Sequence, residues 1–178
     1  NNEAEAKYMI DDAIDKAKSG RYDELNDDQK VLVNFANWTI KEDLYWGYKY
    51  FNDKCYFQAI KHFECVLGAI HPVFDTLTKK QKTDILGVYF RTGFAYTELN
   101  VYSKALYYLD IPYCFGNLDG CMAYITCLLK AKDFRASDII ENQLSMITER
   151  LRDYDEEDEV PDSYMEYRNF LLRNRVIM

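Results

Sequence analysis

The feature that most constrains the fold is a pattern of small and aromatic residues that occurs twice in the sequence. Each copy has a Gly, then a Tyr, then an Ala at the same spacing: Gly47, Tyr50 and Ala59, followed by Gly93, Tyr96 and Ala105. Both copies lie in stretches whose apolar residues recur at helical spacing, where small side chains let two helices approach closely. The recurrence after 46 positions, from Gly47 to Gly93, predicts tandem pairs of antiparallel helices.

The first copy carries further residues, because Trp46 precedes Gly47 and both Phe63 and Pro72 follow Ala59. With these additions the pattern resembles the tetratricopeptide repeat (TPR) family. In that family a Gly and a Tyr lie on a first helix, and an Ala, an aromatic residue and a closing Pro lie on a second.

The resemblance weakens along the chain. The second copy has Leu109 at the aromatic position, and Pro112 comes early. Residues 124–140 form a degenerate third copy, with Phe134 and Ala136 but without the Gly and Tyr. The resemblance implies an all-α fold of tandem antiparallel helix pairs, stacked as a TPR-like α-solenoid with a right-handed superhelix, in one domain over residues 1–178.

The resemblance also implies a structural role for the repeated residues. Gly47 and Gly93 are expected where a first helix crosses a second, with Ala59 and Ala105 as the opposing small surface, so a larger side chain there would force the helices apart. The accompanying aromatic residues are expected in the core: Trp46, Tyr50, Phe63 and Tyr96.

Capping signals predict where the helices begin and end. Gly20 is a suitable end for the first helix. Helix starts are predicted where a capping residue stands three positions before an acid or amide: Asn26 with Gln29, Thr39 with Glu42, Thr78 with Gln81, and Ser163 with Glu166. The predicted helix pairs span about 3–38, 40–70, 79–113 and 118–152, and a last helix spans about 162–176. Six acids in residues 153–159 repel one another, so residues 153–160 should be a solvated linker.

Composition narrows the class of partner and compartment. A net charge of −8 argues against nucleic acid, which needs clustered Lys and Arg, and favours basic or neutral ligands. No apolar run approaches the length of about 18 residues that a membrane span requires. Five cysteines without the spacing of a disulfide scaffold favour a reducing compartment, so the expected location is the cytoplasm. Because the first residue is Asn1, the chain is either processed or part of a longer one. The loss of a targeting signal before residue 1 is therefore an open alternative.

By resemblance, ligands bind on the concave face formed by the first helix of each pair. Counting from the two Gly positions, the candidate groove residues are Lys41, Leu44, Tyr48, Phe51 and Asn52 in the first copy, and Phe90, Phe94, Thr97 and Glu98 in the second. This stripe is mainly aromatic, which favours an apolar segment or an amphipathic helix as the occupant. The alternative is that the same aromatic residues pack against neighbouring helices.

The sequence gives little support for an enzyme or for a metal-binding site. The sequence lacks the motifs of common hydrolases, metalloproteases and phosphate-binding loops, and only two His are present. The best metal-like group is Cys55, His62, Cys65 and His71, but Cys55 lies about 10 Å along a helix axis from His62. Cys114, Cys121 and Cys127 also lack metal spacing. No catalytic residue, metal or cofactor is therefore predicted.

The function predicted from the sequence is that of a non-enzymatic scaffold, which binds a protein or peptide on the concave face of a TPR-like array. Two alternatives stay open: a regulatory or interaction arm of a longer signalling or catalytic protein, and a TPR-type secretion chaperone.

Overall fold

The computed structural model describes residues 2–154 and 159–175, and within these ranges the chain is all-α, without a β-strand. The helices are α1 (Asn2–Lys18), α2 (Asp27–Val33), α3 (Trp38–Asn52), α4 (Tyr56–Ile70), α5 (Lys79–Glu98), α6 (Tyr102–Cys114), α7 (Leu118–Lys130), α8 (Arg135–Arg152) and α9 (Asp162–Asn174). Two 3₁₀ segments, η1 (Tyr22–Glu24) and η2 (His71–Thr76), follow α1 and α4. No helix in the described ranges is both long enough and apolar enough to cross a membrane.

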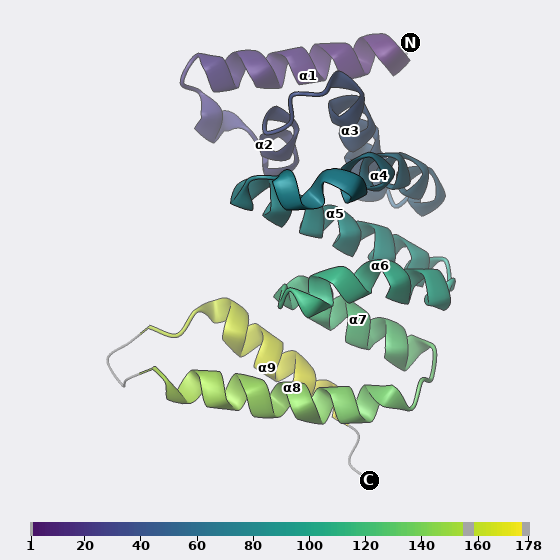
Figure 1. Ribbon diagram of the computed structural model, residues 1–178, viewed down its shortest axis with the longest axis vertical. Coiled ribbons are helices and arrows are strands. Elements are labelled where there is room, and N and C mark those ends of the chain that lie inside the picture. The colour runs from purple at the N-terminus through teal and green to yellow at the C-terminus, as the bar shows by residue number, and fades with distance from the viewer. Residues whose placement is uncertain (1, 155–158, 176–178) are drawn as a thin grey trace.

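Consecutive helices pack against each other along the whole described chain. Figure 1 shows them following one another along the longest axis of the molecule, with α1 at one end and α8 and α9 at the other. Odd-numbered helices also touch, since α1 contacts α3, α5 contacts α7, and α7 contacts α9. Cavities between odd-numbered helices are therefore bordered by segments distant in the sequence.

Two glycines of the repeated pattern lie at helix crossings. A Cβ atom added to Gly47 on α3 would lie 2.4 Å from the Phe63 ring on α4. A Cβ atom added to Gly93 on α5 would lie 2.3 Å from Leu109 on α6. In both cases the contacted residue comes 16 positions after the glycine (63 − 47 and 109 − 93), so the two crossings use the same register.

A third glycine takes part in a crossing that the repeated pattern does not mark. A Cβ atom added to Gly120 on α7 would lie 2.5 Å from Pro112 on α6. Helix α6 therefore approaches both α5 and α7 closely, at Gly93 and at Gly120.

The residues of the repeated pattern lie in the core with two exceptions, Tyr50 and the closing Pro72, which is exposed in η2. The buried ones are Trp46, Gly47, Ala59, Phe63, Gly93, Tyr96 and Ala105. Tyr50 is half-buried, and its ring stacks on His62 with the ring centres 5.8 Å apart.

Five helices end in the same type of turn, with Gly20 and Gly116 at the positive-φ position after α1 and α6, and other residues there after α3, α5 and α7. Lys54, Asn100 and Lys132, which follow α3, α5 and α7, have positive φ angles of 59°, 62° and 54°. After each of them, a backbone N–H donates to the carbonyl five residues earlier, as in a Schellman motif: Cys55 to Tyr50, Val101 to Tyr96, and Asp133 to Leu128. The turn at Lys132 lies inside residues 124–140, where Ala136 is buried and Phe134 is 87 % exposed.

Two of the expected capping pairs are present and two are replaced. Asn26 and Thr78 accept hydrogen bonds from the backbone N–H groups of Gln29 and Gln81, and the Gln side chains accept in return.

At the other two starts the cap differs from the prediction. Asn37, not Thr39, caps α3 and accepts from the backbone N–H of Ile40 at 3.1 Å, because Asn is at least as good a cap as Thr and the earlier start adds helix. Helix α9 follows Pro161 directly rather than starting from Ser163.

The remaining ends can be compared with the predicted ranges. The first helix pair, predicted over residues 3–38, ends earlier in the structure, because α2 ends at Val33. The next three pairs span 38–70, 79–114 and 118–152. Residues 155–158 of the expected acidic linker and residue 176 of the expected last helix lie outside the described residues.

We predict opposite effects for two Gly→Ala substitutions in helices. Gly93→Ala should lower the free energy of unfolding by about 1–3 kcal/mol, because the new methyl group collides with Leu109. Gly68→Ala on α4 should raise it by about 0.5–1 kcal/mol, because nothing lies within 4 Å of the added Cβ and Ala is the better helix former. Urea unfolding of both variants measures the difference, and equal effects would contradict the crossing at Gly93.

A second pair of variants tests the start of α3. Asn37→Ala should cost about 1 kcal/mol of unfolding free energy, because the N–H of Ile40 loses its acceptor. Thr39→Ala should change it by less than about 0.5 kcal/mol, as is usual for an exposed residue. Thermal melts followed by circular dichroism compare the two, and a larger loss in Thr39→Ala would show that Thr39 is the cap.

Candidate functional site

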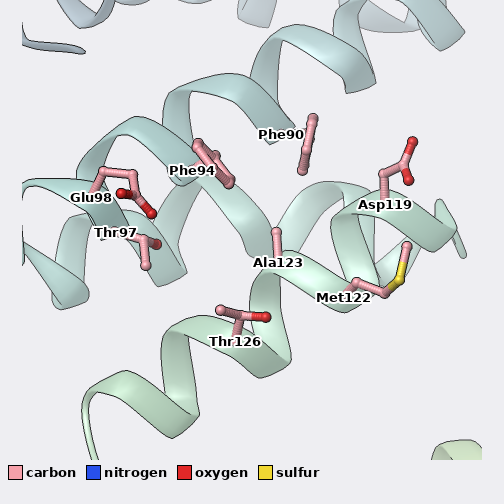
Figure 2. Close-up of a pocket in the computed structure, with 8 residues that line it drawn as sticks. All are labelled: Phe90, Phe94, Thr97, Glu98, Asp119, Met122, Ala123 and Thr126. Carbon is pink, nitrogen blue, oxygen red and sulfur yellow. The ribbon is translucent and has the colours of Figure 1, made fainter. Parts of the chain in front are cut away.

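The candidate site is a cavity of about 190 Å³ between α5 and α7. Figure 2 shows the side chains that line it. Phe90, Phe94, Thr97 and Glu98 come from α5, and Asp119, Met122, Ala123 and Thr126 come from α7. The cavity opens to solvent, since Glu98 and Asp119 are exposed and Phe90 and Phe94 are half-buried.

Helical periodicity explains why each helix contributes four residues. On α5 and on α7 the lining residues are spaced by one, three or four positions, so each set occupies one face. Helix α6 packs beside these faces, against Gly93 of α5 and Gly120 of α7, which do not line the cavity. Because α6 contacts both helices, it holds α5 and α7 at the separation that leaves the cavity between them.

Aromatic contacts support the apolar side of the cavity. The Phe94 ring lies 5.7 Å from Phe51, 6.1 Å from Tyr56 and 6.1 Å from Phe90, measured between ring centres. The first two contacts are edge-to-face, a favoured geometry for aromatic pairs. Phe94 therefore has a fixed position between the core and the cavity.

Two carboxylates border the apolar surface. Glu98 pairs with Lys130 of α7 at 3.1 Å, and the two side chains are 34 % and 42 % exposed. Burial raises the pKa of Tyr56, the charge of Glu98 raises it further, and the charge of Lys130 lowers it. Asp119 lies in the first turn of α7, where a negative charge suits the helix dipole.

The groove residues predicted from the second copy lie together. Phe90, Phe94, Thr97 and Glu98 all line this cavity. Thr97 contributes little polarity, because it is 3 % exposed and its hydroxyl donates to the carbonyl of Gly93 at 2.9 Å.

The groove residues predicted from the first copy lie elsewhere, and here the structure corrects the expectation of an open aromatic stripe. Leu44 is fully buried and Tyr48 is 3 % exposed. Both belong to a core cluster with Ile10 of α1 and Leu32 of α2, and half-buried Phe51 packs against the same cluster. Helices α1 and α2 cover this side of α3, so its aromatic residues pack internally.

The remaining first-copy residues do not join the main cavity. Asn52, together with Tyr48, lines a second cavity of about 260 Å³ between α1, α2 and α3. There the amide of Asn52 donates to Asp28 at 3.1 Å. Lys41 is half-buried, and it lines neither of these two cavities.

The contribution of α7 was absent from the predicted site. Its lining residues, Asp119, Met122, Ala123 and Thr126, follow an i, i+3, i+4, i+7 pattern that marks one helical face. The pattern was available in the sequence, but the degenerate third copy has no Gly-x2-Tyr from which to count that face.

The two histidines of the metal-like group make other contacts. His62 Nδ1 lies 2.9 Å from Asp43, and His71 Nδ1 lies 3.4 Å from the Tyr89 hydroxyl. Among the residues that the structure describes, no three His, Cys, Asp or Glu side chains gather as a metal site would require. All five cysteines are free thiols, and burial raises the pKa of Cys121 to about 11.

Comparison of this chain with protein-family models, with curated proteins and with solved structures finds no match.

Two Tyr→Phe substitutions should separate a packing tyrosine from a hydrogen-bonded one. The buried Tyr48 hydroxyl has no hydrogen-bond partner among the described residues, so Tyr48→Phe should raise the free energy of unfolding by about 1 kcal/mol. The Tyr96 hydroxyl donates to Glu64, so Tyr96→Phe should lower it by about 1–2 kcal/mol. Denaturant unfolding measures both, and a loss of stability in Tyr48→Phe would reveal a missed partner.

Proposed function

We propose that this chain is a non-enzymatic scaffold that binds an apolar or amphipathic segment of another protein in the cavity between α5 and α7. The observation that carries the proposal is the cavity itself, in which two phenylalanines face a small and flexible surface of Ala123 and Met122. Apolar surface that is open to solvent at a defined hollow is typical of interaction sites.

We also propose that the helices form a TPR-like α-solenoid of antiparallel pairs, α3 with α4, α5 with α6, and α7 with α8. The shared 16-residue register of the crossings at Gly47 and Gly93 supports it. So do the turns at Lys54, Asn100 and Lys132, where a residue other than glycine has a positive φ after the first helix of each pair. In such an array the odd-numbered helices line one face, which is where the cavity lies.

The size of the cavity suits a single large side chain. An apolar protein cavity of about 150 Å³ is large enough to bind benzene. The volume here, about 190 Å³, therefore accommodates one Phe or Leu side chain as an anchor. An amphipathic helix supplies such an anchor and keeps its polar face in water.

A cavity-filling substitution tests this function. The probe is an acetylated and amidated helical peptide of about 15 residues, long enough to retain some helix, built from Ala and Gln with a central Phe and one flanking Leu at helical spacing. Methyl NMR of the methionines reports binding, because Met122 lines the cavity whereas Met146 lies on α8. We expect the probe to shift the Met122 signal selectively.

Ala123→Phe should fill the cavity and weaken binding at least about tenfold, which corresponds to 1.4 kcal/mol. The control is Ala69→Phe, which adds the same side chain at an exposed position of α4 and should leave affinity unchanged. Equal affinity of both variants, or a shift of Met146 in place of Met122, would exclude this cavity as the binding site.

A further inference from the structure

A carboxylate borders the cavity at each end. Figure 2 shows Glu98 on one side of the two phenylalanine rings and Asp119 on the other, and both are exposed. Among the described residues, no basic side chain lies within ion-pair distance of Asp119. A segment whose apolar anchor enters the cavity therefore places its neighbouring residues beside two carboxylates.

Only Glu98 already has a basic partner. Lys130 lies in the last turn of α7 and reaches across to α5, with its ammonium nitrogen 3.1 Å from a Glu98 oxygen. Both side chains are more than a third exposed, and solvent-exposed ion pairs are weak. An incoming ammonium or guanidinium group can therefore replace Lys130 at little cost.

We infer that the cavity selects a segment with basic residues on both sides of its apolar anchor, and that Lys130 occupies the Glu98 position until one of these residues displaces it. This inference rests on the proposed function. It adds the charge of the partner and assigns Lys130 as an intramolecular competitor.

Glu98 and Asp119 therefore contribute unequally to the preference for a basic segment. At Glu98 the partner exchanges one surface ion pair for another, so the net gain is small. At Asp119 a new pair forms without breaking one, so most of the charge preference of the wild type arises there. Without Lys130, Glu98 should contribute fully to the preference for a basic segment. The effects of substituting Lys130 and Glu98 on this preference should therefore be non-additive.

The test uses the probe peptide in three forms, with Lys, Gln or Glu one turn before and one turn after the anchor Phe. We expect the Lys form to bind about two- to fivefold more tightly than the Gln form, and the Glu form more weakly than both. Raising the salt concentration should reduce this preference, because exposed charges are screened.

Four variants assign the preference to individual residues. Asp119→Asn should remove most of it, and Glu98→Gln should change it little in the wild-type background. Lys130→Ala should tighten the Lys form about two- to fivefold and leave the Gln form unchanged. Lys79→Ala on the far end of α5 is the control, because it removes the same charge away from the cavity and should not alter the preference.

The outcomes separate this inference from the proposed function. If the Gln form shifts Met122 but the Lys form binds no better, the charge selection is wrong and the apolar site stands. If Lys130→Ala and Lys79→Ala tighten the Lys form equally, Lys130 is not a competitor and only net charge acts. If no form shifts Met122, both the inference and the proposed function fail.

Discussion

The close approach of two helices at a glycine is the contact on which the rest of the structure depends. At Gly93 the side chain of Leu109 occupies space that any Cβ atom would need, and Phe63 does the same at Gly47. Repulsion between overlapping atoms rises steeply, so a larger residue at either crossing must displace the contacted side chain or the helix that carries it. The apolar side chains around them can then interlock at the density of a protein interior.

Helix α6 transmits this constraint to the candidate site. It meets α5 at Gly93 and α7 at Gly120, and both contacts are tight. Beside these contacts, Phe94 of α5 and Ala123 of α7 border the cavity. The glycines thus do not touch a ligand, yet they place the two apolar faces that would receive one.

Stability and recognition depend on different kinds of contact in this arrangement. The crossings are buried and tolerate little change, whereas the charges at the cavity ends are exposed. An exposed pair such as Glu98 with Lys130 contributes little to folding, so it can be exchanged for a partner's charge. The proposed selection for a basic segment therefore needs no rearrangement of the core.

The sequence by itself determined the features that depend on short spacing. Apolar periodicity indicated the helices, Asn26 and Thr78 marked two of their starts, and the repeated pattern marked Gly47 and Gly93 as packing positions. Counting from Gly93 grouped Phe90 and Phe94 on one face, and these residues do line one cavity.

Only the tertiary structure decided which neighbour covers each face. The same count from Gly47 placed Leu44 and Tyr48 on an open stripe, but α1 and α2 bury that side of α3. It also decided that α7 supplies half of the cavity, opposite α5. The physical reason is that helical periodicity specifies which residues share a face, whereas the burial of that face depends on contacts with helices distant in the sequence.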